Sequence, residues 1–375
     1  MKKVTSALAF IIVLSPGLAM ANAGTPLALA TFFHLLVGNF LLGLLEGAIL
    51  ARAFKLRRRR CIGLMIIANY FSALAGWFIL YEVHLGWTPD LYNALRFFWT
   101  LVFIAYALTL LLEWPFVALC LRGAPHWFAK SLKGSVIIQT ISYLLLFALF
   151  WPLSNTDLYT HFTRVPPGRV ALPADVYVFY VSKMDGNVYC RSALSGATKV
   201  SDLKSTEVAA VDYSLHIRQS AKGKSESWDL VAVPKENDRW GKGTIIVVPR
   251  IMENPPQSVW QQYEKSRIAP ARIGSATQSA WEFLWDRPIG GKGAFGGSNK
   301  QKREDLYVGY DTPVFGWDIW RPIHLPGDKI LFQLGRDQLC LLDVETRQLA
   351  LWERGHGAVA VPKEALSIHT PLAAK

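Results

Sequence analysis

Motifs that specify metal or nucleophilic chemistry are absent from this chain of 375 residues. It has only four cysteines, and no HExxH, GxSxG, CxxC or calcium-loop pattern occurs. Each pattern fixes ligands or a nucleophile at a set spacing, so its absence removes the enzyme and metal-binding classes that it marks. We therefore predict no metal and no cofactor, and an enzyme is the least favoured class of function.

Acidic residues are scarce before Ser154, where 12 Lys/Arg and only four Asp/Glu occur. From Ser154 onward the counts are 28 and 24, so most of the net charge of +12 belongs to the N-terminal part. The same part contains almost all the long apolar runs. Basic residues beside apolar runs are typical of the cytoplasmic edge of a membrane protein, which argues against nucleic-acid binding.

The N-terminus has the three regions of a secretory signal peptide. Two lysines precede an apolar stretch at 4–18, and a small-x-small cleavage pattern ends at Ala23. We predict that residues 1–23 are a signal peptide. The alternative is an uncleaved first helix, against which the helix-breaking pair Pro16-Gly17 argues.

Four apolar segments follow, each near the ~20 residues that a bilayer core requires. They are Pro26–Ala51, Ile62–Tyr81, Phe97–Leu121 and Ser135–Leu153. The first and third loops between them contain nine basic residues, whereas the second contains one. The four apolar segments predict that residues 24–153 form a bundle of four transmembrane helices. Because basic loops remain in the cytoplasm, the first and third loops are predicted to lie on that side. The chain would then be a multi-pass protein of the bacterial inner membrane with its C-terminal domain in the periplasm.

Four polar residues within these segments are candidate site residues, and the two glutamates among them require an explanation because an ionisable group in hydrocarbon costs at least ~2.5 kcal/mol. They are Asn39, Glu46, Asn69 and Glu113. Small residues spaced by four beside Asn39 and Glu46 favour a tight hairpin of the first two spans. The two carboxyl groups, at similar depth, are a candidate proton or cation site. The alternative is that Glu46 pairs with Arg52 at the membrane edge.

After a Pro-rich linker at 154–173, the periodicity changes to the alternation typical of strands. The expected strands form two similar groups of three, each with short turns: 176–181, 188–190 and 198–203, then 329–334, 338–343 and 348–352. Such groups resemble blades of a β-propeller. We predict an all-β extracytoplasmic domain over 174–375, as an irregular propeller; a β-sandwich or another β-rich fold is the alternative.

Cys190 and Cys340 occupy matching positions in these two groups. A shared oxidising compartment would allow a disulfide. Equivalent strands of two blades would, however, hold the Cα atoms beyond the ~7 Å limit for a disulfide. This distance favours the alternative of two buried free thiols.

Four tryptophans of this domain are candidates for a partner-binding face: Trp281, Trp285, Trp317 and Trp320. An indole ring supplies flat contact area and a hydrogen-bond donor. The alternative is packing in the core or against the membrane surface.

Two functions from different classes follow. The first is an extracytoplasmic binding, scaffold or sensing domain that the bilayer anchors and that contacts a protein or another envelope component. The second is a small transport or ion-coupling module that uses Glu46 and Glu113, with the external domain as an accessory.

The predicted sidedness is testable with reporter fusions. Fusions after Leu56 and His126 should report a cytoplasmic location, and fusions after Pro89 and Lys375 an exported one. An exported signal from the Leu56 fusion would contradict the whole topology.

Overall fold

The computed structural model describes residues 26–86, 89–201, 213–220, 227–234, 244–253, 271–273, 276, 278–286 and 293–367. The predicted signal peptide lies outside them. The described chain divides into two compact units. One is helical and comprises residues 26–155 with Asp311–Gly316; the other, from Thr156, is built mainly of strands.

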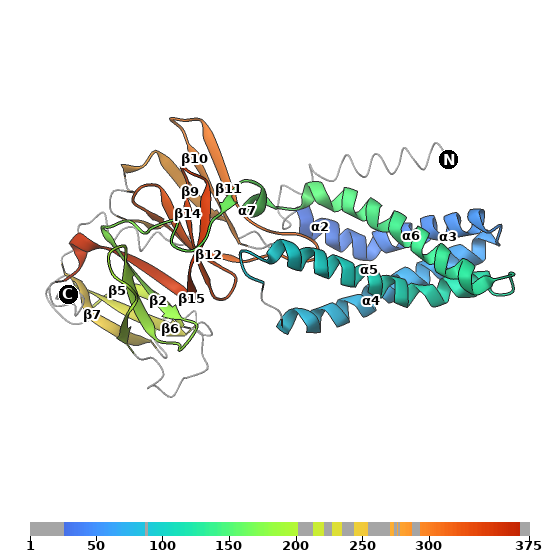
Figure 1. Cartoon of the computed structure of the whole chain (residues 1–375), viewed down its shortest axis with the longest axis horizontal. Helices are drawn as coiled ribbons and strands as arrows, with labels where there is room; N and C mark the ends of the chain where they lie inside the picture. The colour runs from blue at the N-terminus through green and yellow to red at the C-terminus, as the bar shows by residue number, and fades with distance from the viewer. Residues whose placement is uncertain are drawn as a thin grey trace. The chain divides into compact units, whose positions relative to one another are not determined.

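The helical unit is a bundle of four long helical segments (Figure 1). The first comprises α2 (Pro26–Phe33), one turn of π-helix, η1 (His34–Gly38), and α3 (Asn39–Ala53), without a break in right-handed backbone geometry. The others are α4 (Arg58–Gly86), α5 (Ala94–Leu121) and α6 (Trp127–Phe150), with a 3-10 turn, η2 (Trp151–Leu153), after the last. Helices α3 to α6 pack α3 on α4, α4 on α5, α5 on α6 and α6 on α3, which gives the bundle an interior.

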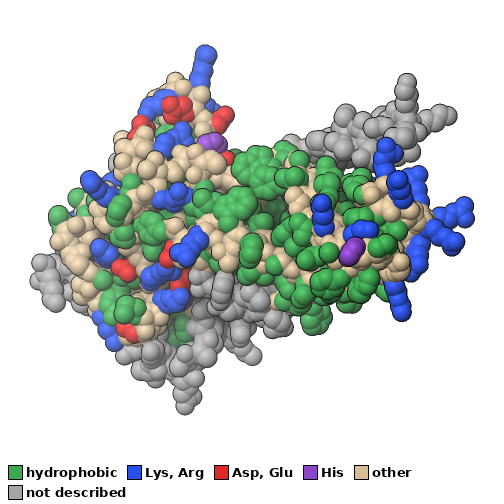
Figure 2. Space-filling model, turned by 45° about the vertical axis from the view of Figure 1, so that its right-hand side comes forward, with side chains coloured by type: hydrophobic (Ala, Val, Ile, Leu, Met, Phe, Trp, Pro, Cys, Tyr) green, Lys and Arg blue, Asp and Glu red, His purple; other side chains and the backbone are tan. Residues whose placement is uncertain are grey.

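The surface of this unit is that of a membrane protein. Three of its described segments, Ala30–Ala53, Ala94–Leu121 and Trp127–Leu153, are long and apolar enough to cross a membrane. Large apolar side chains point outward, and those of Phe103 and Leu144 are 70% and 65% exposed. Figure 2 shows this apolar surface, with most Lys and Arg side chains of the helical unit gathered at one end. Lipid tails tolerate such a surface, whereas water does not.

The second predicted span, Ile62–Tyr81, lies within α4, which is not among those three segments. Its helical conformation is confirmed, and its crossing of the membrane stays a prediction.

Glycines bring α3 and α4 into close contact, as the predicted hairpin requires. A Cβ atom added at Gly43 would lie 2.5 Å from the Cα atom of Ile66, and one added at Gly47 would lie 2.5 Å from the Cα atom of Ile62. Real Cβ atoms do not approach a neighbouring backbone so closely. The two helices can therefore pack at this distance only because both positions lack a side chain.

The β unit contains a curled half-barrel sheet and two three-stranded sheets. The order in the large sheet is β4-β3-β2-β15-β14-β13-β12-β8, with β1 added in parallel beside β15. The small sheets are β5-β6-β7 and β9-β10-β11, and the first of them shares an apolar core with β2, β3 and β15. The strands are β1 (Thr163–Arg164), β2 (Val176–Ser182), β3 (Val188–Ser192), β4 (Thr198–Ser201), β5 (Tyr213–Gln219), β6 (Ser227–Pro234), β7 (Ile245–Glu253), β8 (Ala271–Arg272), β9 (Trp281–Asp286), β10 (Ala294–Asn299), β11 (Glu304–Val308), β12 (Ile319–Leu325), β13 (Lys329–Leu334), β14 (Gln338–Asp343) and β15 (Gln348–Pro362).

The six expected strands are confirmed as β2 to β4 and β13 to β15. A propeller is not confirmed, because both groups belong to one sheet. The long strand β15 pairs with β14 over its first part and with β2 over its second, with a bulge between His356 and Val359. This strand joins the two groups edge to edge, whereas propeller blades are separate sheets around an axis.

Cys190 and Cys340 are free and buried, so the disulfide alternative is wrong. Cys190 lies on β3 and Cys340 on β14, with β2 and β15 between them. Three interstrand steps correspond to about 14 Å, twice the reach of a disulfide. Burial raises the pKa of the Cys190 thiol to about 12, which keeps it protonated and unreactive.

The glycine contact predicts a mutational asymmetry. Gly43→Ala should cost about 1–3 kcal/mol, because the new methyl group must push α3 away from the backbone of α4. Gly63→Ala on α4 is the matched control, since nothing lies within 4 Å of its added Cβ atom. Thermal unfolding of the purified full-length protein in detergent measures both. Equal melting temperatures would contradict the close packing.

Candidate functional site

Glu46 lies inside the helical bundle and is 1% exposed. Asn69 of α4 donates a hydrogen bond through Nδ2 to one carboxylate oxygen at 2.6 Å. Ser142 of α6 donates to the other oxygen at 2.5 Å. Asn69 also donates to the carbonyl oxygen of Met65 at 3.0 Å, so both N–H groups of its amide are in use and its orientation is fixed.

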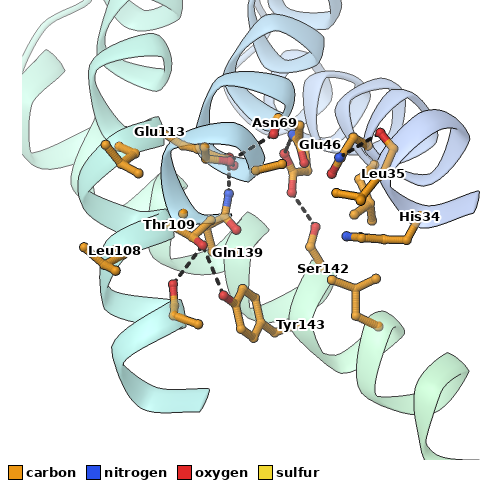
Figure 3. Close-up of a pocket in the computed structure, with 18 residues that line it drawn as sticks. His34, Leu35, Glu46, Asn69, Leu108, Thr109, Glu113, Gln139, Ser142 and Tyr143 are labelled. Atoms are coloured by element: carbon orange, nitrogen blue, oxygen red, sulfur yellow. Dashed lines mark hydrogen bonds between the residues drawn. The ribbon is translucent and has the colours of Figure 1, made fainter. Parts of the chain in front are cut away.

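Glu113 of α5, also 1% exposed, has an equivalent environment. Ser72 of α4 donates to its Oε1 at 2.5 Å, and the side-chain amide of Gln139 on α6 donates to its Oε2. Both carboxyl groups therefore receive one bond from an amide and one from a hydroxyl group. Figure 3 shows these bonds converging from four helices on one region of the bundle.

The four donors follow a simple rule that relates two helical hairpins, α3–α4 and α5–α6. In each hairpin the first helix supplies a glutamate, and the second supplies an amide and, three residues later, a serine. The amide binds the glutamate of its own hairpin, and the serine binds the glutamate of the other hairpin. The site thus has approximate two-fold symmetry.

The same rule appears in the sequence as a weak internal repeat. Leu-Leu-Glu ends at Glu46 and again at Glu113, and amide-x-x-Ser occurs at Asn69–Ser72 and again at Gln139–Ser142. Within a hairpin the glutamate and the amide are 23 and 26 residues apart, respectively.

A cavity of about 250 Å³ adjoins both carboxyl groups. Its wall includes His34 and Asn39 from the first helical segment and Thr109 and Tyr143 from α5 and α6, which hydrogen-bond to each other at 3.1 Å. Figure 3 shows His34, Thr109 and Tyr143 around the carboxyl groups. The wall mixes polar side chains with leucines and alanines, and a cavity of this size with polar groups in its wall can hold water molecules.

The hydrogen-bond partners of both carboxyl groups among the described residues are neutral. Arg52 is exposed and does not pair with Glu46, so the predicted alternative of an edge ion pair is wrong. Two ionised carboxylates in this interior would be costly, because each buried charge without a counter-charge is penalised by several kcal/mol. The site therefore requires a proton or a cation for neutrality.

No family model, no curated protein and no solved structure matches the chain. The function is therefore inferred from the geometry of the site.

Three of the four polar residues predicted in the membrane, Glu46, Asn69 and Glu113, meet in this site. Asn39 lines the cavity but donates its amide to the carbonyl oxygen of Leu35 at 3.2 Å. Ser72, Gln139 and Ser142 did not enter the predicted site. The repeat of amide-x-x-Ser at matching places of two hairpins is the signal that identifies all three.

The four tryptophans do not form one exposed face. Trp281 and Trp317 are 1% and 4% exposed, so their indole rings belong to the core, where Trp317 stacks on Tyr159. Trp320 is half-buried. The side chain of Trp285 lies outside the described residues.

The β unit has a groove of its own, of about 530 Å³, on the outer face of the β9-β10-β11 sheet. One row across this face is Leu284, Gly296 and Tyr307, and the next is Glu282, Ser298 and Asp305. Helix α7 (Asp157–Thr160) supplies Asp157 to the groove. Burial raises the pKa of Asp157, an effect that the neighbouring His161 opposes. In the described part of the chain, no group of three or more His, Cys, Asp or Glu side chains could hold a metal ion.

The donors to the carboxyl groups predict a contrast between two serines of α6. Ser142→Ala should cost about 1–3 kcal/mol, because it leaves an oxygen of Glu46 without its donor in a buried place. Ser135 is the matched control: its hydroxyl group is equally buried and has no hydrogen-bond partner among the described residues. Ser135→Ala should be neutral or stabilising. Chemical or thermal unfolding in detergent compares them, and equal losses would contradict the role of Ser142.

Proposed function

We propose that the chain crosses the bacterial cytoplasmic membrane four times, with α4 as the second crossing. At 29 residues α4 is about 43 Å long, which exceeds the ~30 Å hydrocarbon core. The glycine contacts with α3 along this helix support a shared depth for both. The basic loops would lie in the cytoplasm, which places the β unit on the opposite, extracytoplasmic side.

Within this membrane protein, we propose that the helical unit is an ion-coupling module whose binding site is the pair Glu46 and Glu113. The observation that carries this proposal is the hydrogen-bonding rule: two hairpins each give one amide and one serine to two buried carboxyl groups beside a polar cavity. An ionisable group inside a membrane is expensive, and it persists where an ion has to bind.

The carboxyl groups would bind the ion, and the four donors would hold them in place. A structural role alone would be met at lower cost by apolar side chains, since replacing a buried polar network by well-packed apolar groups is often neutral or stabilising.

A second function has support in the β unit. The groove over β9-β10-β11 combines exposed Leu284 and Tyr307 with the carboxyl groups of Glu282, Asp305 and Asp157, and it would suit a partner with apolar and basic groups. The extracytoplasmic binding or scaffold function therefore remains the alternative, with the bundle as its anchor.

The two functions differ in the effect of Glu46→Gln. Under the ion-coupling function, this change keeps the hydrogen-bonding shape, removes the titratable group and abolishes proton- or cation-driven flux in reconstituted vesicles. Glu113→Gln should have an effect of the same size, because the two carboxyl groups are equivalent. Under the anchor function, both variants fold and bind their partner as before.

An internal dye sensitive to pH or to the cation measures the flux. Glu304→Gln is the control, since this carboxylate is half exposed in the β unit, 3.9 Å from Arg347. Wild-type flux that survives unchanged in both buried Gln variants would contradict the proposal.

A further inference from the structure

The cavity extends from the carboxyl groups in one direction along the bundle. Its wall is made of residues 34–46 of the first helical segment, 69–76 of α4, 105–113 of α5 and 139–146 of α6. The basic loops follow α3 and α5 and precede α4 and α6, so all four stretches extend from the level of the carboxyl groups away from these loops. We call the end of the bundle opposite to the basic loops the distal end. Among the wall residues of α3 and α5, Glu46 and Glu113 lie nearest to the basic loops. The cavity therefore ends at the carboxyl groups on that side.

In the opposite direction, toward the basic loops, lies an apolar plug, a cluster of six side chains that are each 0–1% exposed. They are Leu50, Met65, Ala68, Val117, Leu121 and Ile138. Leu50 follows Glu46 by one helical turn, Val117 follows Glu113 by one turn, and Met65 precedes Asn69 by one turn. Ala68 and Ile138 directly precede the donors Asn69 and Gln139, so the plug begins beside the site and lies between the carboxyl groups and the basic loops.

Polar side chains continue from the carboxyl groups along the cavity wall in the distal direction. On the side of the basic loops, the buried hydroxyl groups of Ser135 and Ser131 on α6 lie beside the plug. Thr109 and Tyr143 form a hydrogen-bonded pair on the cavity wall, and half-buried His34 stands near the distal end of its helical segment. These groups can exchange hydrogen bonds with water in the cavity, whereas the plug has no polar side chain that could do so.

The donor set argues against a hard divalent cation and suits a proton. Hard divalent cations take six or more oxygen ligands, whereas each of the four carboxylate oxygens here accepts a bond from an N–H or O–H donor, and the donors turn their hydrogens toward the carboxyl groups. A proton needs a single lone pair on one oxygen and no other ligand.

We propose that the ligand of this site is a proton, which enters and leaves through the cavity from the distal end while the apolar plug closes the end with the basic loops. Loading transfers one proton from hydronium to a carboxylate oxygen and leaves water; release reverses this step. The inference rests on the proposed ion-coupling function and adds the ligand and its route.

Cysteine accessibility tests the route in the full-length protein with Cys61→Ala and Cys120→Ala as background. Ala73→Cys places a thiol in the cavity wall, and Ala68→Cys, five residues away on the same helix, places one in the plug. A membrane-impermeant thiol reagent should label Ala73→Cys at least about tenfold faster, because a plug residue is reached only after local opening. Val117→Cys is a second plug position in case Ala68→Cys does not fold.

Two controls fix the geometry of this experiment. Arg57→Cys, in the basic loop between α3 and α4, is exposed and identifies which face of the vesicle carries that end. Leu111→Cys, 67% exposed on the outer surface of α5, detects reagent that arrives through the lipid. Labelling of Ala73→Cys only from the face opposite to Arg57→Cys supports the route. Labelling from the same face as Arg57→Cys, or equal rates at Ala73 and at a plug position, overturns it.

Infrared spectroscopy of the carboxylic C=O stretch tests the ligand without requiring transport. The band should titrate with pH, lose intensity in both Glu46→Gln and Glu113→Gln, and stay unchanged on addition of Na⁺, K⁺ or Mg²⁺ at constant pH. A band that shifts with any of these cations, or that does not titrate, overturns the proton as ligand. If flux is lost in the Gln variants while either result here is negative, the ion-coupling function stands and its ligand or route is wrong.

Discussion

Two carboxyl groups without a basic partner, inside a bundle whose outside is apolar, impose the main constraint on this protein. A buried carboxyl group must have its oxygens satisfied and its charge neutralised. The chain meets the first requirement with four neutral donors taken from α4 and α6. These donors must arrive from both hairpins at once, so the site fixes how the hairpins are placed around it. The glycines that bring α3 against α4 serve the same end, since they set the depth of Asn69 relative to Glu46.

The sequence predicted the individual elements better than their combination. Hydropathy identified the helices, and alternation with turn residues identified β13 and β14 at their observed bounds. The small-residue stripe predicted the α3–α4 hairpin, because glycines four residues apart lie on one face of a helix and allow another helix to approach closely. A contact between α6 and α3 could not be predicted in this way: Ser142 and Glu46 are 96 residues apart, and a serine in an apolar helix carries no local signal of its partner.

The β unit illustrates the same limit at the level of topology. Two groups of three strands with similar turns are compatible with separate blades or with one sheet, because local pattern does not encode which edges pair. The choice depends on β15, which continues well beyond the expected Trp352 to Pro362 and carries its pairing across the bulge from β14 to β2. The sequence of this extra stretch alternates and contains glycines, which is compatible with a strand but does not specify the neighbouring strand with which it pairs.

The division of the hydrogen bonds between the hairpins suggests how occupancy of the site and shape of the bundle depend on each other. The amide bonds, Asn69 to Glu46 and Gln139 to Glu113, are internal to a hairpin and survive any rigid movement of one hairpin against the other. The serine bonds, Ser72 to Glu113 and Ser142 to Glu46, cross between hairpins and would break in such a movement. A carboxylate attracts hydroxyl donors more strongly than a protonated carboxyl group does, so the charge on the pair sets the strength of the two crossing bonds. Protonation weakens all four of these bonds, but the glycine contacts that hold α3 against α4 do not depend on the charge, so the contacts between the hairpins are the more sensitive to it.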